Sequence, residues 1–252
     1  MINPTFNIGP VTIHYYGITI AFATFLGWAL AKRRAPKYKI PQEIFDELQI
    51  LLVIALALVG ARIYHVLDYW KYYSQNLISI FYITNGGIGI WGALFGGLFG
   101  LYIFTKIKKI PLLVALDLTV PSLILAQAIG RIGNYINQEG FGPPTRMPWG
   151  VYIDPSKRPT QYLANSYFHP TFFYEAAIDL AIFIALIYFA KRTQTSGKVF
   201  ALYLILYSAS RFFVEFLRID TWTIGTIKIA QVIAILTFFF GLNLLINRKK
   251  AS

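Results

Sequence analysis

Apolar residues gather in seven long runs that are separated by shorter polar stretches. Each run is close to the roughly 20 residues that an α-helix needs to cross a bilayer. The runs lie at 11–31, 48–67, 86–105, 112–130, 171–190, 198–217 and 227–247. The pattern predicts an all-α integral membrane protein, with seven transmembrane helices in a single membrane domain over residues 1–252.

The distribution of charge supports this prediction. The chain is 56% hydrophobic and 13% charged, and its net charge of +12 would suit a nucleic-acid partner if it were spread over a soluble surface. Most basic residues instead follow the first, third, fifth and seventh runs, which predicts an outside N-terminus and a cytoplasmic C-terminus. They are Lys32, Arg33, Arg34, Lys37, Lys39, Lys106, Lys108, Lys109, Lys191, Arg192, Lys198, Arg248, Lys249 and Lys250. No nucleic-acid partner is therefore expected.

Residue types that carry many other chemistries are scarce. Cysteine is absent, which excludes disulfides, thiolate metal sites and a cysteine nucleophile. The three histidines, His14, His65 and His169, have no metal-ligand spacing, so we expect no metal. The first 17 residues lack a basic n-region and a small-residue cleavage site, so we expect the first run to remain in the protein rather than act as a removable signal peptide.

Two segments between or within the runs have a distinctive composition. Residues 135–169 are rich in Gly, Pro and aromatics, which predicts a small outward cap between the fourth and fifth helices. Residues 86–100, GGIGIWGALFGGLFG, repeat small residues at three- and four-residue spacings. Such a helix face favours close helix packing, although contact with a lipid headgroup is the alternative.

The segment GRIGNYINQEGFG, residues 130–142, places Arg131, Asn134, Asn137 and Glu139 at the end of an apolar run. An ionisable group in the bilayer core costs about 2.5–3.5 kcal/mol, so a membrane protein that keeps one usually pairs it or uses it. On a helix, Arg131 and Asn134 would share a face, as would Asn134 and Asn137. The alternative is a frayed helix end from which Arg131 reaches the interface.

A second polar cluster lies in SASRFFVEFLRID. Arg211 and Glu215 are four residues apart and are expected to form an ion pair on one helix face. Arg218 offers Glu215 a second arginine, and the remaining positive charge could hold an anion.

Two further clusters are expected at the outer ends of the first and fifth helices. His14, Tyr15 and Tyr16 begin the first, where interfacial anchoring is the ordinary role of such residues. The segment HPTFFYEAAID begins the fifth and contains His169, Tyr174, Glu175 and Asp179. Glu175 and Asp179 would repel each other if both were ionised, which calls for a nearby cation. Arginines gathered at the outer leaflet suit a phospholipid phosphate.

These segments together resemble the prolipoprotein diacylglyceryl transferase family. Residues 130–142 are similar to its signature Gly-Arg-x-Gly-Asn-Phe-x-Asn-x-Glu-x-x-Gly, with Tyr135 in place of Phe. IGPVTIHYYG, GGIGIWGALFGG, HPTFFYEA and SRFFVEFLR resemble other family segments in the same order. The resemblance implies a bacterial inner-membrane enzyme that moves the diacylglyceryl group of phosphatidylglycerol to the lipobox cysteine thiol of a prolipoprotein. Glycerol phosphate leaves, and no cofactor is implied.

The resemblance also implies the roles of individual residues. Arg131 and Arg211 are expected to stabilise the departing phosphate, and Glu139 is the first choice of proton acceptor, ahead of His14 and His169. The lipid-binding set would comprise Arg131, Asn134, Asn137, Gly142, Glu215, His14 and His169, with Tyr16 beside the reaction centre. Trp91 stands where studied family members carry His, so a base at that position is excluded.

Two other functions compete with this one. A transporter or channel for an anionic solute could line a path with Arg131, Arg211 and Arg218. It would also need polar groups toward the inner leaflet, but the spans carry few such residues, with Asp117 and Asp179 as the main exceptions. A catalytically inactive lipid-binding relative would keep the arginines without the chemistry.

Overall fold

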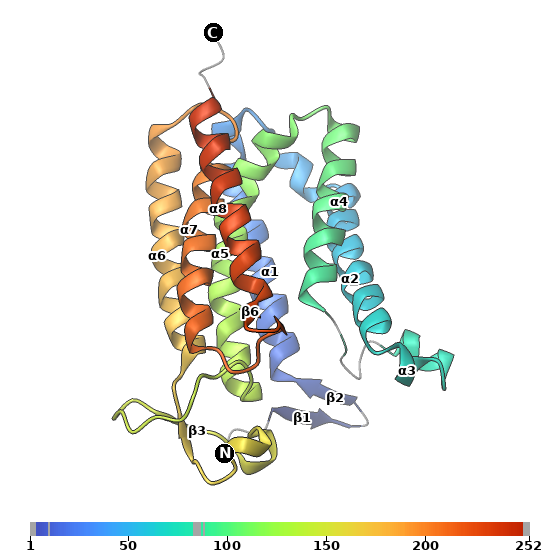
Figure 1. Ribbon diagram of the computed structural model, residues 1–252. Coiled ribbons are helices and arrows are strands. Elements are labelled where there is room, and N and C mark those ends of the chain that lie inside the picture. The colour runs from blue at the N-terminus through green and yellow to red at the C-terminus, as the bar shows by residue number, and fades with distance from the viewer. Residues whose placement is uncertain (1–3, 10, 83–86, 88, 249–252) are drawn as a thin grey trace. The chain divides into compact units, whose positions relative to one another are not determined.

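The computed structural model describes residues 4–9, 11–82, 87 and 89–248 (Figure 1). Every predicted apolar run contains a long helix. The helices are α1 (Tyr15–Arg34), α2 (Leu48–Asp68), α4 (Ile90–Lys108), α5 (Leu112–Asn137), α6 (Thr171–Arg192), α7 (Lys198–Val214) and α8 (Ile229–Asn247), with a short α3 (Trp70–Tyr73). Lys249 and Lys250, which contributed to the predicted orientation, lie outside the described residues.

Six of these helices, α2 and α4 to α8, are long and apolar enough to cross a membrane, which confirms the class of integral membrane protein. Large apolar side chains such as Leu236 and Phe239 on α8 are exposed, as a lipid-facing surface requires. α1 occupies the first predicted run but is not among the six. A seventh crossing and the orientation of the termini stay predictions.

The start of the first run differs from the prediction. Residues expected to be helical from position 11 instead form strand β2 (Val11–His14), which pairs antiparallel with β1 (Thr5–Ile8). β-branched residues in both segments favour strands, and Gly9 adopts a φ of +59° after β1. The Tyr15 N–H then donates to the Pro4 carbonyl at 3.0 Å. This hairpin places His14 directly before α1.

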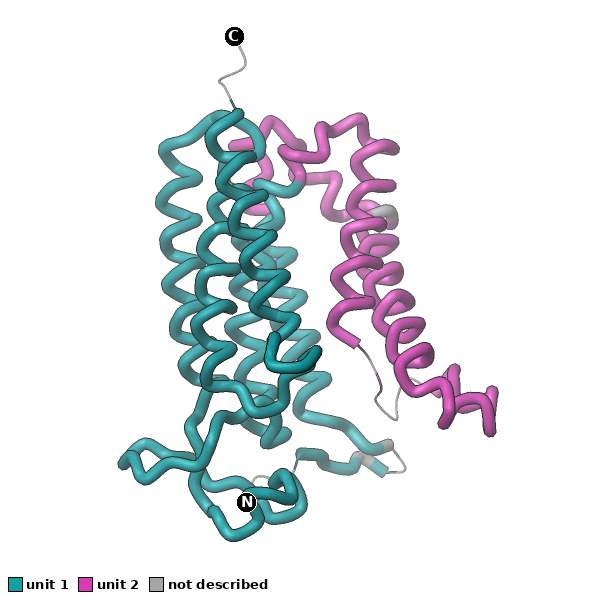
Figure 2. The backbone as a smooth tube through the Cα atoms, viewed as in Figure 1, with its two compact units in different colours: residues 1–31, 116–252 teal, residues 32–115 magenta. Residues whose placement is uncertain are grey.

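The chain forms two compact units, residues 1–31 with 116–252 and residues 32–115 (Figure 2). In the first unit, a core of buried side chains joins α5, α6 and α7: Val120, Ile124, Ile182, Leu186, Ala190, Val199 and Tyr203. α8 packs on α7 and is preceded by a hairpin of β5 (Thr223–Ile224) and β6 (Ile227–Lys228). The single domain predicted from the sequence stays a prediction.

Asp117 fastens α5 to the start of α7 in the first unit. Its side chain is buried and accepts hydrogen bonds from the backbone N–H groups of Gly197 at 2.6 Å and Phe200 at 2.7 Å. The first N–H groups of a helix have no partner within the helix, and a carboxylate is well suited to accept from them. The charge of Asp117 therefore serves the helix start.

In the second unit, α2 and α4 pack through glycines. Gly92 lies against Gly60, and a Cβ added at Gly96 would overlap the carbonyl oxygen of Leu56. A Cβ at Gly100 would lie 2.9 Å from the Cα of Val53. The spacing of four residues puts these glycines on one helix face, which confirms the predicted close packing. Gly86, the first residue of this segment, lies outside the described residues.

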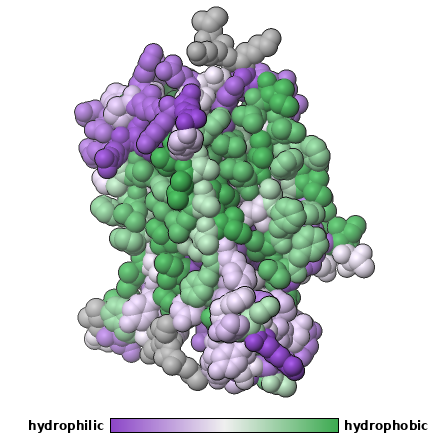
Figure 3. Space-filling view, turned by 90° about the vertical axis from the view of Figure 1, so that its left-hand side faces the viewer, coloured by the Kyte–Doolittle hydropathy of each residue, from purple (hydrophilic) through white to green (hydrophobic). Residues whose placement is uncertain are grey.

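Between α5 and α6, residues 138–170 form the cap segment. Strands β3 (Val151–Tyr152) and β4 (Tyr167–Phe168) pair antiparallel, and Phe141, Ile153, Phe168 and Phe172 form a small buried core. On the face of the molecule shown in Figure 3, apolar side chains cover the middle of the helices, and hydrophilic ones gather at the end where α6 finishes with Lys191 and Arg192.

The glycine packing gives a prediction for the second unit. Gly96→Ala should lower the stability of the fold by about 1–3 kcal/mol, because the added methyl has no space against the α2 backbone. The midpoint of thermal unfolding in detergent measures this. Gly97→Ala is the matched control, since its Cβ would lie at an ordinary 3.5 Å from the Ala57 Cβ. Equal midpoints for the two variants would contradict the packing.

Candidate functional site

The polar end of α5 is helical past the predicted boundary at residue 130. The helix continues to Asn137, and positive φ angles at Gln138 (53°) and Gly140 (68°) then reverse the chain. The Glu139 N–H donates to the Asn134 carbonyl at 2.9 Å, so the turn folds back on the helix. Arg131, Asn134 and Asn137 thus lie on ordered helix, which contradicts the alternative of a frayed end.

Side chains from this segment form a connected polar row. Arg131 Nη1 donates to Asn134 Oδ1 at 3.4 Å, and Asn134 Nδ2 donates to Glu139 Oε1 at 3.0 Å. Asn137 Nδ2 lies 3.4 Å from the same Glu139 oxygen. The shared faces predicted from the i, i+3 spacings are confirmed. The row links a cation to a carboxylate through a neutral amide.

Glu175 on α6 lies between two arginines. It forms an ion pair with Arg131, and Arg218 Nη1 lies 3.1 Å from its Oε1. The Glu175 side chain is only 6% exposed, so both partners compensate a buried charge. The predicted need for a cation near Glu175 and Asp179 is met at Glu175 by these two arginines.

At the end of α7, Arg211 and Glu215 form the predicted ion pair at 2.6 Å. Arg218 differs from the expectation, because its ion pairs are to Glu175 and Asp220 rather than to Glu215. A 3-10 turn over 215–217 ends the helical path of α7 and directs Arg218 away from the Arg211–Glu215 face. Sequence spacing could not locate this turn.

Nearby carboxylates keep the guanidinium of Arg218 protonated. Burial alone would lower the pKa of its guanidinium, but the negative charges of Asp220 and Glu175 outweigh burial and raise that pKa above the ordinary value. Lys228 Nζ also donates to the Glu215 carbonyl at 2.5 Å, which anchors β6 to the same turn. The site is thus a compensated network of cations and carboxylates.

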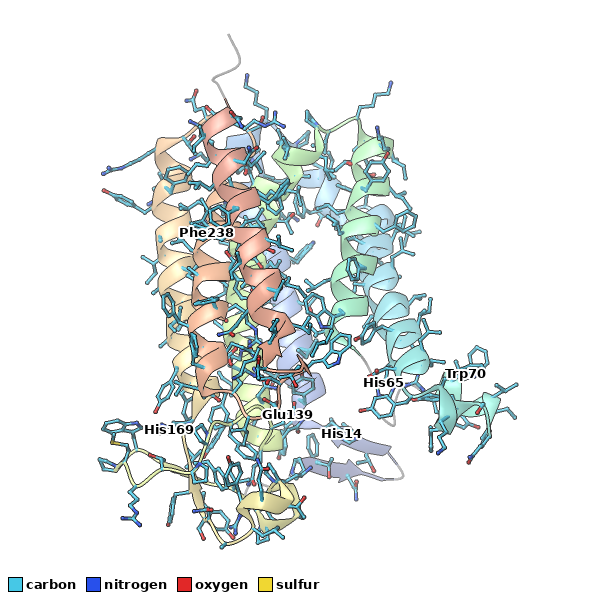
Figure 4. The ribbon with its side chains drawn as sticks, viewed as in Figure 1. His14, His65, Trp70, Glu139, His169 and Phe238 are labelled. Atoms are coloured by element: carbon cyan, nitrogen blue, oxygen red, sulfur yellow. The ribbon has the colours of Figure 1, made fainter. Side chains whose placement is uncertain are left out.

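Tyr16 on α1 packs against α5 at Gly133, and His14 in the preceding hairpin lines a cavity together with Glu139. The Tyr16 ring packs so closely on Gly133 that a Cβ there would overlap it, and the charges of Glu139 and Arg131 act on the Tyr16 hydroxyl. A cavity of about 500 Å³ opens beside them. It is lined by Pro4, Thr5, His14, Asn137, Gln138, Glu139, Gly140, Phe141, Lys157, Pro159, Ile219 and Asp220. Figure 4 shows His14 and Glu139 beside each other at this end.

Gly142 and His169 lie where the two ends of the cap cross. The Gly142 N–H donates to the His169 carbonyl at 2.8 Å, and a Cβ on Gly142 would lie 2.9 Å from the Leu217 carbonyl oxygen. Close packing therefore explains the glycine at position 142. His169 Nδ1 lies 3.2 Å from the Tyr174 hydroxyl, which also accepts from Trp149 Nε1 at 2.7 Å. His169 is not among the residues that line the cavity.

Glu175 is the main residue of the site that sequence reasoning left out of the candidate set. Its signal was the pair of carboxylates, Glu175 and Asp179, one turn apart at the start of an apolar helix. Trp91, at the family histidine position, lies in the first turn of α4 in the second unit and is 42% exposed.

The fold and site define a polytopic membrane protein with an arginine-rich polar centre at one end of a helical unit. The chain belongs to the prolipoprotein diacylglyceryl transferase family, whose sequence profile matches residues 3–247. This family assignment confirms the resemblance of the signature segments.

Curated relatives cover nearly the whole chain. Phosphatidylglycerol–prolipoprotein diacylglyceryl transferases of Acaryochloris marina and a Nostoc species are 41% and 42% identical, over 94% of this chain and 87% and 85% of their own lengths. The Finegoldia magna enzyme of the same name is 38% identical over 97% of this chain and 95% of its own. The chain is therefore similar to these transferases over 94–97% of its length.

The Glu175 bridge gives a prediction. Glu175→Gln should destabilise the protein by about 3–5 kcal/mol, because it leaves Arg131 and Arg218 without a shared buried counter-charge. The thermal unfolding midpoint in detergent measures this. Asp46→Asn is the control, since it removes an ion pair to Lys32 with side chains 28% and 56% exposed and should cost about 0–1 kcal/mol. A midpoint for Glu175→Gln within the range of the control would contradict the bridge.

Proposed function

We propose that this protein transfers the diacylglyceryl group of phosphatidylglycerol to the lipobox cysteine thiol of prolipoproteins. Membership of the family and the names of relatives at about 40% identity support the reaction. The observation that carries it is Arg131, which Asn134 and Glu175 hold at the polar end of α5 and which Asn134 links to Glu139, a residue that lines the cavity. An arginine so placed suits a lipid phosphate.

The topology follows from this function. The protein would cross the bacterial inner membrane seven times, with α1 as the additional crossing, and its N-terminus would lie outside. The arginine centre and the cap would then face the outer leaflet. Prolipoproteins would present their cysteine on that side, and phosphatidylglycerol would come from the surrounding bilayer.

The chemistry is a displacement at carbon. The cysteine sulfur forms a bond to the CH₂ carbon of the diacylglyceryl group that carries the phosphate. The bond from that carbon to the phosphate oxygen breaks, and glycerol phosphate leaves with the electron pair. Negative charge grows on the departing phosphate, where fixed cationic donors lower the barrier. Arg131 and Arg211 take this role. Each already has a carboxylate partner, so the phosphate must join or replace Glu175 and Glu215.

The thiol must lose its proton before it attacks, because the thiolate is the nucleophile. Glu139 is the first choice of acceptor. It lines the cavity, and Asn134 connects it to Arg131. His14 lines the same cavity and is the second choice. His169 is third, since it contacts Tyr174 in the cap.

The remaining residues of the set would hold and shape the headgroup site. Asn134, Asn137 and Tyr16 offer neutral hydrogen bonds to lipid oxygens. Glu215 would orient Arg211, and Gly142 would allow the cap to cross close to the end of α7. Neither a metal nor an organic cofactor enters this scheme.

The transporter alternative is disfavoured by Asp117. A conduit for an anionic solute needs polar side chains at depth toward the other leaflet. Asp117, one of the two main residues that could serve there, is buried and accepts from two backbone N–H groups of the α7 start. The second alternative, a lipid-binding relative without activity, would give no transfer of diacylglyceryl to a lipobox peptide, so the transfer assay distinguishes it from the enzyme.

Arginine removal tests the phosphate-binding role. Arg131→Ala and Arg211→Ala should each lower transfer of labelled diacylglyceryl from phosphatidylglycerol to a lipobox peptide by about 10²–10³-fold, the usual effect of losing one charge-stabilising donor. Membrane insertion should persist. Arg146→Ala, which removes an exposed arginine of the cap, is the matched control and should keep full activity. Full activity in either test variant would remove that residue from the mechanism.

The proton acceptor is tested by pH dependence. Glu139→Gln should lose most turnover near pH 6, and the deficit should narrow toward about pH 9, where a thiol of ordinary pKa near 8.5 ionises without help. Asp154→Asn is the control. Hydrogen bonds from Ser156 hold the pKa of the Asp154 carboxyl below its ordinary value, so it does not titrate in this range. A wild-type profile in Glu139→Gln would exclude Glu139 as the base.

A further inference from the structure

We infer that Asp179 is a positioning residue for Arg131. Its carboxylate holds the Nε side of the Arg131 guanidinium when a lipid phosphate replaces Glu175 as the partner of that arginine. The inference rests on the proposed function, since it concerns how Arg131 becomes available to phosphatidylglycerol. It starts from two buried polar atoms for which the described residues provide no hydrogen-bond partner.

The first of these atoms belongs to Asp179. The residue lies on α6, one turn from Glu175, and is 2% exposed. Its Oδ2 is buried and has no hydrogen-bond partner among the described residues. Leaving a carboxylate oxygen in that state is costly, so a buried one usually accepts at least one hydrogen bond.

The second atom is Nε of Arg131, which is also buried and without a partner among the described residues. The other two nitrogens are engaged, Nη1 with Asn134 and Nη2 with Glu175. The pair is complementary, because Nε–H can only donate and the carboxylate oxygen can only accept. Asp179 lies one helical turn beyond Glu175 on the same face of α6, and Glu175 contacts Arg131, so the three groups belong to one buried layer.

The ion pairs of Glu175 explain why Arg131 needs a second carboxylate nearby. Glu175 also contacts Arg218, so it can release Arg131 to a phosphate without becoming an unpaired buried charge. Among the described residues Arg131 forms an ion pair with Glu175 alone, and it would lose that partner when it binds the lipid. A carboxylate on the Nε side compensates the cation and leaves the Nη1 and Nη2 edge for the phosphate.

Neighbouring groups on α7 fit this arrangement. Ile178, next to Asp179 on α6, and Tyr207 on α7 both pack against the core that joins α5, α6 and α7, so the three helices meet at this layer. Asp117 on α5 provides the contrast, because both of its oxygens accept backbone N–H groups and its role is structural. Asp179 has no such use in the described residues.

The test measures transfer kinetics with phosphatidylglycerol as the varied substrate. Asp179→Asn and Asp179→Ser should raise KM for phosphatidylglycerol about 10- to 100-fold, the range expected for a lost hydrogen bond between charged groups, with a smaller effect on kcat. Asp179→Glu keeps the charge and should recover a large part of the loss. Asp117→Asn, the control, should lower the unfolding midpoint and leave KM unchanged.

A double-variant cycle tests whether Asp179 acts through Arg131. Lysine has no equivalent of Nε–H, so adding Asp179→Asn to Arg131→Lys should change KM by less than about twofold. A second readout needs no turnover: phosphatidylglycerol should raise the unfolding midpoint of the wild type more than phosphatidylcholine does, and Asp179→Asn should lose that difference.

The outcomes separate the two proposals. Absence of transfer by the wild-type protein refutes the proposed function itself. With an active wild type, an unchanged KM in Asp179→Asn overturns the role of Asp179. The role of Asp179 is also overturned if Asp117→Asn raises KM equally, or if Asp179→Asn still raises KM in the Arg131→Lys background. If neither Asp179→Asn nor Asp179→Ser accumulates as folded protein, Asp179 is purely structural and the role is likewise overturned.

Discussion

The structure depends on the rule that a charge held away from water must have a partner. Glu175 satisfies it for two arginines at once, Arg131 from α5 and Arg218 from the segment after α7. These contacts join three parts of the chain that are far apart in sequence. An isolated charge at such a position costs several kcal/mol, so the helices can assemble only in an arrangement that brings all three together.

Other buried polar groups follow the same rule in different ways. Asp117 accepts from the start of α7 and serves the fold, whereas Arg211 and Glu215 compensate each other within one helix. The Asn134 amide connects Arg131 to Glu139 without adding charge. Arg131, Arg211 and Arg218 thus each have a carboxylate partner, and the proposed function requires the capacity of Arg131 and Arg211 to exchange that carboxylate for a phosphate. That capacity connects the packing of unit 1 to the proposed transfer from an anionic lipid.

The reaction proposed for this chain needs a proton acceptor as well as an anion site. Different residues serve the two needs, since arginines bind the anion and another side chain must accept the proton. Tryptophan at position 91 cannot take a proton, while Glu139 and His14 line the same cavity. In the proposed reaction Arg131, which Asn134 links to Glu139, favours the ionised form of an entering thiol. A weak base beside strong cations is therefore a consistent way to generate the nucleophile.

The length of the apolar runs determined the membrane class and, except at the end of α5, the helix positions within a few residues. Local periodicity determined the shared face of Arg131 and Asn134, the Arg211–Glu215 pair and the glycine face of α4, because a helix fixes the geometry of residues three or four apart. Only the tertiary structure decided that Glu175 bridges two arginines and that Arg218 pairs with Glu175 and Asp220 instead of Glu215. It also decided that residues 11–14 form a strand and that His169 contacts Tyr174 in the cap. Those contacts depend on how loops and helix ends return to one another, and no spacing in the sequence encodes that path.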